Sequence, residues 1–243
     1  MGDKIEILKL APKEFTKSFL IEGAQGIVPE WWKRELNYEG IIVKPIYGSG
    51  GNYILKFWIE NLHLKSQQLH LKDSNKINKH KIKDLSPKVI FEIWRSHFNK
   101  NEKIFAMPYF LSSKKLFNAS PSIAIRVITE RKLTNNNLYI INNWMEYTMG
   151  NKIILQNDKG IKLIASRNEI IVKLLSQSEN LYFEKFFKEC GMASKLMHSR
   201  LINIDRIAWD WIPSDNGPML LEGNACFGLF IPQIFCQVEK RYF

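Results

Sequence analysis

Three oxygen-bearing side chains near the C-terminal end of the chain have the spacing of a divalent-cation site. Asp210 precedes a turn-forming segment, and Glu222 and Asn224 follow it at alternate positions of a strand-like run. Side chains alternate across a strand, so Glu222 and Asn224 share one face. Hard cations such as Mg²⁺ take oxygen ligands from a few carboxylates, and substrate phosphates complete the shell. The segment therefore predicts a magnesium site on a hairpin.

The length of the hairpin turn decides whether Asp210 joins that site. A three-residue loop over 215–217, with Gly217 at positive φ, sets Asp210 opposite Glu222. A two-residue turn over 216–217 instead sets Asp210 opposite Gly223, on the other face of the hairpin. The metal hypothesis requires the longer loop. An ordinary exposed hairpin with a charged face is the alternative interpretation.

A second segment, IIVKPIYGSGG (41–51), has the composition of a phosphate-binding flap. An apolar run leads to Lys44, and a glycine-rich loop follows, made of Gly48, Ser49, Gly50 and Gly51. Glycines let backbone N–H groups close around phosphate oxygens, and a lysine at a strand end adds a point charge. The loop lacks the Gly-Lys-[Ser/Thr] of a Walker loop, and no helix start follows it. Alone, such a loop is more often a flexible turn, so its interpretation depends on the downstream carboxylates.

Together these segments resemble the ATP-grasp superfamily, and within it the sugar-transfer-associated, α-L-glutamate-ligase-related branch. The resemblance rests on residues 41–51, on SPSIAIRVIT (120–129) and on AWDWIPSDNGPMLLEGN (208–224). It spans about Glu39 to Gln233 and implies an α+β fold of two α+β subdomains with the nucleotide site between them. Few residues precede Lys44, so the pre-ATP-grasp domain of that superfamily is expected to be missing or much reduced.

The expected division of the chain has three parts. Residues 1–38 form a helical lead-in, 39–105 a small subdomain with the flap, and 106–243 a large subdomain with the metal-binding strands. Hydrophobic periodicity predicts helices from Pro12 to about Gly23, from Pro87 onward after an N-cap at Ser86, and over about 179–200. Strands are predicted over 40–47, 52–59, 103–110, 123–129 and 138–142, and a hairpin over 151–164 with its turn at 157–160.

The resemblance assigns roles to individual residues. Asp210, Glu222 and Asn224 hold Mg²⁺, Lys44 and the flap residues 48–51 bind the ATP phosphates, and Arg126 lies against the transferring phosphate, where its planar fork suits phosphoryl oxygens. The segment FAMPYFLS (105–112) corresponds to the hinge between subdomains, and Met107 and Tyr109 are the candidates for the adenine wall. Met107 stands where relatives usually carry Gln or Glu. Either Lys13 or Lys17 is a candidate for a further ATP contact.

The activity that the resemblance implies is ATP- and Mg²⁺-dependent ligation. A carboxylate attacks the γ-phosphoryl group, and an amine captures the acyl phosphate; the acceptor is unknown, and the branch suggests a link to surface polysaccharide. The alternatives are a phosphotransferase with a hydroxyl acceptor and a non-catalytic nucleotide-binding relative. Related peptide ligases often carry arginine two positions before the metal-binding Asp, and this chain has Ala208 there. Acceptor binding falls to the basic insertion and the 144–150 region, or to a partner chain or oligomer.

Composition agrees with a cytoplasmic enzyme. The net charge of +11 is concentrated around 65–103, where Lys, Asn and Ile enrichment is typical of an AT-rich genome. No RNP-like, zinc-finger or helix-turn-helix pattern occurs, so no specific nucleic acid partner is expected. No apolar run approaches the ~18–20 residues of a membrane span. Three cysteines without CxxC spacing argue against a disulfide framework. His198 is interpreted as a helix-end residue rather than a substrate contact.

Overall fold

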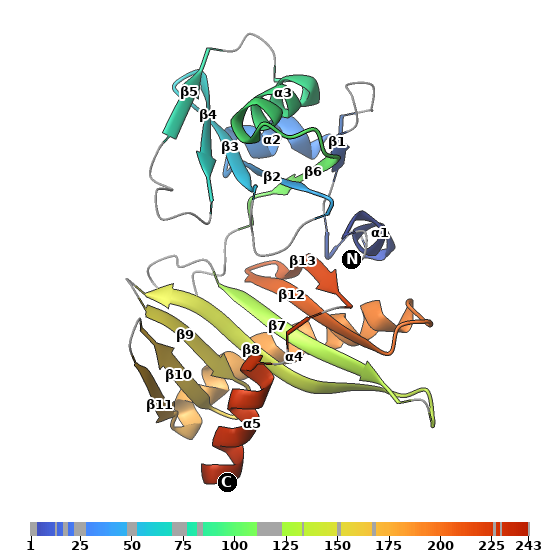
Figure 1. Ribbon diagram of the computed structural model, residues 1–243, viewed down its shortest axis with the longest axis vertical. Helices are drawn as coiled ribbons and strands as arrows, with labels where there is room; N and C mark the ends of the chain where they lie inside the picture. The colour runs from blue at the N-terminus through green and yellow to red at the C-terminus, as the bar shows by residue number, and fades with distance from the viewer. Residues whose placement is uncertain are drawn as a thin grey trace. The chain divides into compact units, whose positions relative to one another are not determined.

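A computed structural model describes residues 4–12, 14–16, 19–21, 28–47, 53–69, 77–81, 85–110, 123–132, 134–149, 152–166, 169–225, 227–228 and 230–242 (Figure 1). The chain divides into two compact units. The small unit contains Thr16–Phe110 with Asp3–Lys9, and the large unit contains Leu111–Phe243 with Leu10–Phe15. None of the helices in the described ranges is both long and apolar enough to cross a membrane.

The small unit is built on a six-stranded antiparallel sheet of order β1-β6-β2-β3-β4-β5. Its elements, in chain order, are α1 (Lys4–Leu10), β1 (Phe19–Ile21), α2 (Trp31–Asn37), β2 (Ile41–Pro45), β3 (Leu55–Glu60), β4 (His63–Gln68), β5 (Ile77–His80), α3 (Pro87–Phe98) and β6 (Ile104–Pro108).

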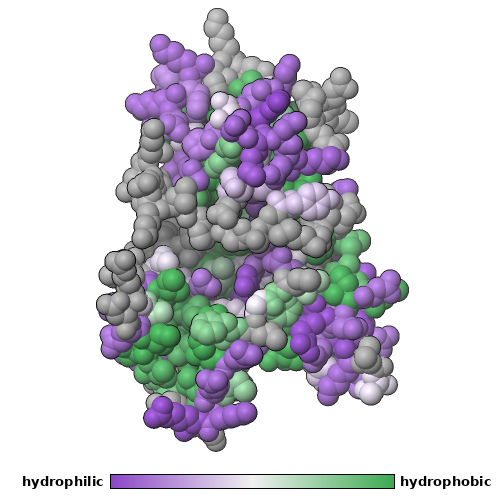
Figure 2. All heavy atoms as spheres, viewed as in Figure 1, coloured by the Kyte–Doolittle hydropathy of each residue, from purple (hydrophilic) through white to green (hydrophobic). Residues whose placement is uncertain are grey.

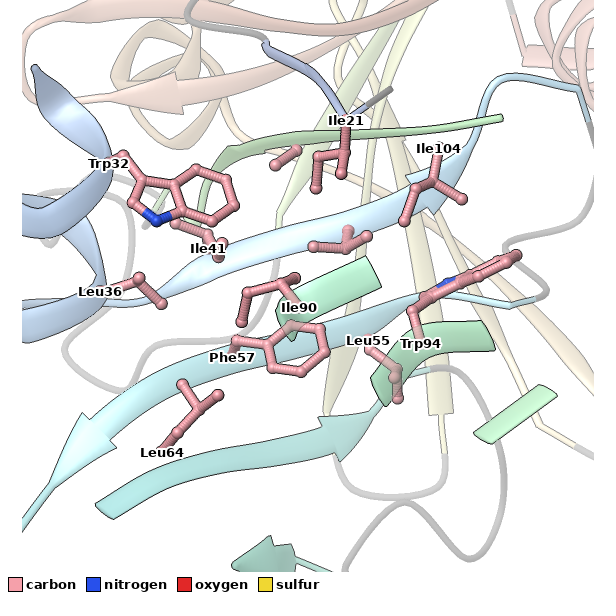
Figure 3. Close-up of a cluster of buried hydrophobic side chains, with 12 residues drawn as sticks. Ile21, Trp32, Leu36, Ile41, Leu55, Phe57, Leu64, Ile90, Trp94 and Ile104 are labelled. Atoms are coloured by element: carbon pink, nitrogen blue, oxygen red, sulfur yellow. The ribbon is translucent and has the colours of Figure 1, made fainter. Parts of the chain in front are cut away.

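One face of this sheet packs against α2 and α3 through a fully apolar layer. Alternate residues of β2 and β3, Ile41 and Val43 with Leu55 and Phe57, are completely buried, as alternation on a half-covered sheet requires. Trp32 and Trp94 reach into this layer from the helices (Figure 3). Their indole N–H groups donate to the carbonyls of Leu85 and Tyr53, at 2.9 Å in each case. Both large rings are therefore buried without an unsatisfied donor.

The large unit is built on a seven-stranded antiparallel sheet of order β11-β10-β9-β8-β7-β12-β13. Its elements are β7 (Ala124–Arg131), β8 (Leu138–Met149), β9 (Lys152–Asn157), β10 (Ile161–Ala165), β11 (Ile170–Leu174), α4 (Gln177–Ser199), β12 (Arg206–Ser214), β13 (Gly217–Asn224) and α5 (Phe230–Tyr242). Figure 1 shows α4 and α5 on opposite faces of the sheet.

The α4 face of this sheet contains a buried polar network. Thr129 Oγ1 accepts a hydrogen bond from Trp209 Nε1 at 2.8 Å and is hydrogen-bonded to His198 Nδ1 at 2.7 Å. His198 Nε2 is 2.7 Å from the carbonyl oxygen of Ile204. Trp211 Nε1 donates to Ser194 Oγ at 2.8 Å. His198 is fully buried in the last turn of α4, so the interpretation as a helix-end residue is confirmed.

The β12–β13 hairpin reaches the expected register by a different route. Ser214 pairs with Gly217 across a two-residue turn, so the three-residue loop was the wrong prediction, although Gly217 does have a positive φ of 100°. A β-bulge between Asp210 and Trp211 then shifts the ladder by one residue and sets Asp210 opposite Glu222. An extra residue in one strand changes which residues of the two strands face each other beyond the bulge. The length of the turn alone does not reveal this change.

Other expectations are corrected by long-range pairing. Of the helix predicted from Pro12 to about Gly23, the described residues 19–21 instead form β1, which pairs with β6. β8 continues to Met149, well beyond the predicted 138–142. Strands β4, β5 and β11 were not predicted. β4 and β5 are rich in polar residues, so no apolar alternation marks them. The helices beginning at Pro87 and near 179, and the hairpin with its turn at 157–160, are confirmed.

Candidate active site

Four polar and aromatic side chains form one row across four adjacent strands of the large unit. Glu222 on β13 pairs with Asp210 on β12, Asp210 pairs with Arg126 on β7, and Arg126 pairs with Trp144 on β8. Residues directly opposite each other project to the same face of a sheet. The sheet therefore brings Arg126 next to the two carboxylates of the hairpin, on the face that α5 partly covers.

Arg126 and Asp210 form a bidentate ion pair. Arg126 Nε donates to Asp210 Oδ1 at 2.5 Å, and a terminal guanidinium nitrogen donates to Oδ2 at 2.6 Å. Asp210 is 7% exposed. The hydrogen bond to Asp210 is the main cause that raises the pKa of Arg126; burial opposes this rise, and the charges of Asp210, Glu146 and Glu222 add to it. The guanidinium is thus a fixed cation among carboxylates, with its Cζ 5.8 Å from the centre of the Trp144 ring.

The donor atoms of this row suit a hard cation. Asn224 Nδ2 donates to Glu222 Oε1 at 2.9 Å, which sets the carbonyl oxygen of the amide as the atom that can ligate a metal. Each ionised carboxylate has about four lone-pair sites, so the Arg126 contacts leave Asp210 with acceptor capacity. Within the described residues, no group of three or more His, Cys, Asp or Glu gathers at one point. The candidate set is two carboxylates and an amide, all oxygen donors.

Trp144, the fourth member of this row, and Glu146 belong to the 144–150 region that was expected to contribute to acceptor binding, but neither was assigned a role at this site. Glu146 pairs with Ala124, one row along from Arg126, and its charge contributes to the raised pKa of that arginine. Trp144 is 2% exposed and lies directly opposite Arg126. The sequence signal for both was alternation: Trp144 and Glu146 occupy the same face of β8. That alternation became informative only once β8 was known to extend to Met149.

The candidates of the small unit share the sheet face that α2 and α3 leave uncovered. Lys44 pairs with Phe105, and its Nζ lies 5.2 Å from the centre of that ring. Met107 pairs with Ile42 on the same face and is fully buried. The backbone N–H of Tyr109 donates to the carbonyl of Gly40 at 2.9 Å. Lys44 is itself only 7% exposed.

Lys56 is a further cation on this face that the sequence did not single out. It pairs with Ile42 on β2, and its Nζ lies 3.7 Å from the centre of the Tyr109 ring. Burial lowers the pKa of Lys56, partly offset by the charge of Glu39. The signal was again alternation, because Lys56 lies between the buried residues Leu55 and Phe57 and must project to the opposite face.

Several candidates lie outside the described residues. These are the flap residues Gly48, Ser49, Gly50 and Gly51 and the two lysines Lys13 and Lys17. Ala208, at the position where related ligases often carry arginine, is fully buried and packs with Trp144 and Phe235. Cys190 and Cys236 are free thiols, and Cys226 is not among the described residues.

The sequence matches no protein-family model and no curated protein. Among solved structures, the D-alanine–D-alanine ligase of Bacillus anthracis complexed with ATP is similar, with a TM-score of 0.50 and 13% identity over 98% of this chain. The VanG D-Ala:D-Ser ligase of Enterococcus faecalis gives a TM-score of 0.43 at 9% identity, covering 92% of this chain and 52% of that chain. This chain covers 60% of the length of the Bacillus anthracis ligase.

At such identities the likeness concerns the fold. The two antiparallel sheets with their helices match the α+β architecture expected from the sequence. The Bacillus anthracis ligase, which has a TM-score of 0.50, is an ATP-grasp ligase. This chain accordingly has an α+β ATP-grasp fold.

Proposed function

We propose that this chain is an ATP- and Mg²⁺-dependent ligase that joins a carboxylate to an amine through an acyl phosphate. The observation that carries the proposal is the row in which Asp210 lies opposite Glu222, with Asn224 hydrogen-bonded to Glu222 and Arg126 paired with Asp210. The ATP found with the similar ligase supports ATP as the cosubstrate.

The proposal assigns the metal, phosphate and adenine contacts to separate sets of residues. Asp210, Glu222 and Asn224 hold Mg²⁺, which supplies charge neutralisation to the ATP phosphates. Arg126 presents a planar fork to the transferring phosphoryl oxygens and stays charged throughout. Lys44 supplies a point charge to the same phosphates, and Met107 with Tyr109 contacts the adenine.

The proposed reaction has two steps, phosphoryl transfer and amide formation. An oxygen of the substrate carboxylate attacks the γ-phosphorus, so the bond to the β–γ bridging oxygen breaks and ADP leaves. The amine nitrogen then attacks the acyl carbon, loses a proton, and displaces inorganic phosphate. Exclusion of water from the site would protect the acyl phosphate from hydrolysis. The resemblance to the sugar-transfer-associated branch favours an acceptor linked to surface polysaccharide.

Mg²⁺-dependent thermal protection by ATP tests the nucleotide site. Wild type is expected to melt at a higher temperature with ATP and Mg²⁺ than with either alone. Asp210→Asn and Glu222→Gln remove metal-ligand charge and should lose this protection. Asp215→Asn is the matched control, since it removes an exposed carboxylate from the turn of the same hairpin. If ATP and Mg²⁺ protected Asp210→Asn and Glu222→Gln as well as they protect Asp215→Asn and the wild type, the metal assignment would be refuted.

Hydroxylamine trapping tests the reaction itself. In the presence of ATP, Mg²⁺ and a panel of amino acids and uronic acids, an acyl phosphate reacts with hydroxylamine to give a hydroxamate, which is detected by mass spectrometry together with ADP. Arg126→Met should abolish the hydroxamate. A phosphorylated acceptor without hydroxamate would indicate phosphotransfer to a hydroxyl group instead of ligation.

A further inference from the structure

The edge of the seven-stranded sheet at β11 exposes an apolar strand. Ile170, Ile171 and Leu174 are 55%, 36% and 47% exposed, respectively. Ile153, which lies two strands away in the row Ile153–Ala165–Ile170, is 46% exposed. Figure 2 shows hydrophobic residues gathered at the lower left of the viewed face, over β9, β10, β11 and α5. Uncovered edges of this kind are templates for pairing with another strand.

Two other strand edges in the described structure are blunted in ways that β11 is not. β5, at one edge of the six-stranded sheet, carries Asn78, Lys79 and His80. β13, at the other edge of the seven-stranded sheet, contains Pro218, and the N–H of Leu220 donates to the carbonyl of Phe15 at 2.7 Å. β11 has the sequence IIVKL, with four β-branched or aliphatic residues and one lysine. Unlike β13, it contains no proline, and unlike β5, most of its residues are apolar.

The backbone of β11 presents a regular set of outward hydrogen-bonding groups. Ser166 N donates to Glu169 O at 2.8 Å, and Leu175 N donates to Gly160 O at 2.9 Å. Hydrogen-bonded and non-hydrogen-bonded pairs alternate along an antiparallel ladder. The backbone groups of the odd-numbered residues of β11 therefore bond to β10. The backbone groups of Ile170, Val172 and Leu174 point away from the sheet.

We propose that this edge pairs with β11 of a second copy of the same chain, antiparallel and centred on Ile171. In that register, Ile170 and Val172 exchange backbone hydrogen bonds with Val172 and Ile170 of the second copy, and the two Ile171 residues face each other. Glu169 of each chain falls directly opposite Lys173 of the other. The two-fold axis of the dimer repeats the Glu169–Lys173 pair. Charge complementarity therefore favours a second copy of the chain as the partner and fixes the register of the two strands.

A charge-swap series in sedimentation velocity tests the pairing. Glu169 and Lys173 are both exposed, so single substitutions leave the fold intact. Glu169→Lys or Lys173→Glu places like charges opposite each other twice per dimer, and each should weaken dimerisation by about tenfold or more. The double variant restores opposite charges and should return the dissociation constant to within about threefold of wild type. Glu184→Lys, an exposed change on α4, is the control that should leave dimerisation unchanged.

Disulfide trapping tests the register independently. Ile171 lies at a position whose own backbone bonds to β10, so the two Ile171 residues form a non-hydrogen-bonded pair with Cα atoms ~4.5 Å apart. That separation suits a disulfide. In a background with Cys226 and Cys236 changed to Ser, Ile171→Cys should cross-link under mild oxidation, and Ile77→Cys on β5 should not.

Two outcomes overturn the proposal. One is a wild-type chain that sediments as a monomer at concentrations up to roughly 100 µM, since a specific strand pairing of this kind is expected at micromolar strength. The other is a dimer whose dissociation constant does not change in the single charge variants. Neither result bears on nucleotide binding, so this inference stands or falls separately from the proposed ligase activity.

Discussion

Both units consist of an antiparallel sheet with helices packed on it, but the polar side chains that the two sheets carry differ in charge. The large unit aligns Asp210 and Glu222 in one row with Arg126. The small unit places Lys44 and Lys56 on its helix-free face, beside the rings of Phe105 and Tyr109. The polar candidates of the large unit thus include two carboxylates, and those of the small unit are lysines.

The supporting cores differ as well. The small unit holds its sheet with an apolar layer in which the polar atoms of Trp32 and Trp94 bond only to backbone carbonyls. The large unit places a buried hydrogen-bonded network of Thr129, His198 and Trp209 beneath β7 and β12. A satisfied polar network adds directional constraints that apolar packing alone does not have.

The largest expected effect is in the apolar core of the small unit. Trp94→Ala removes a fully buried ring and should lower the free energy of unfolding by about 4 kcal/mol, through lost transfer energy and the cavity left behind. Trp94→Phe keeps most of the volume but leaves the Tyr53 carbonyl without its indole donor, and should cost about half as much. Urea unfolding monitored by circular dichroism measures both. Equal costs for the two variants would show that the hydrogen bond dominates the packing.

In the large unit, the expected loss of stability comes from leaving a charged side chain without its partner. Asp210→Ala leaves the guanidinium of Arg126 without its bidentate partner and should lower the free energy of unfolding by about 2 kcal/mol. The cost is below that of a fully buried pair because the Arg126 side chain remains 35% exposed to water. The double variant Arg126→Met with Asp210→Ala should recover most of the loss in urea unfolding. A double variant less stable than Asp210→Ala would contradict this account.

His198 should make the stability of the large unit depend on pH. Burial lowers the pKa of His198; the hydrogen bond to Ile204 opposes this, and the charge of Arg131 adds to it. The folded state therefore binds this proton less readily than the unfolded chain. The contribution is fully present above the unfolded pKa, near 6.5, and is lost as pH falls toward the lowered folded value. The slope should approach ~1.4 kcal/mol per pH unit at most.

Urea unfolding between pH 5 and pH 8 checks this dependence against His198→Gln. The wild-type protein should lose more stability on acidification than the variant does, since Gln does not titrate. Parallel pH profiles for the two proteins would mean that other groups control the acid sensitivity.

The smallest expected effects compare two helix starts. Ser176 caps α4 with a full capping box, in which Glu179 N donates to its hydroxyl and Glu179 accepts from its backbone N–H. Ser86, at the start of α3, makes no side-chain capping bond. Ser176→Ala should cost about 1 kcal/mol, and Ser86→Ala less than about half of that. Thermal unfolding of the two variants measures the difference, and equal losses would refute the contrast.

Local signals in the sequence were sufficient for two of the helices, α3 and α4, and for several turns. Proline at the first position after Ser86 and the stripe of buried residues in α4 fixed two helices correctly. Gly160 and Gly217 both adopt positive φ, as glycines in turns do. Strands β4 and β5 were missed because their polar residues carry little period-two hydrophobicity, and β1 was mistaken for helix because its pairing with β6 is a long-range contact.

The candidate site was foreseen in its residue types but not in its connections. Asp210 opposite Glu222 was expected, yet the pairing depends on a bulge that no local pattern announces. The Arg126–Asp210 ion pair joins residues 84 positions apart, and the involvement of Glu146 and Lys56 followed only from strand register. Register is set by the whole sheet, so a single segment does not contain it.

Residue chemistry, spacing and local propensity by themselves determined which side chains of this protein are candidates to ligate a cation or bind a phosphate, and where α3 and α4 begin. Tertiary structure alone decided which of those side chains lie in one row, which lysines share a face, and which strand was left as an apolar edge. The physical reason is that hydrogen-bonded pairing between distant strands costs chain entropy and is repaid only by the assembled sheet.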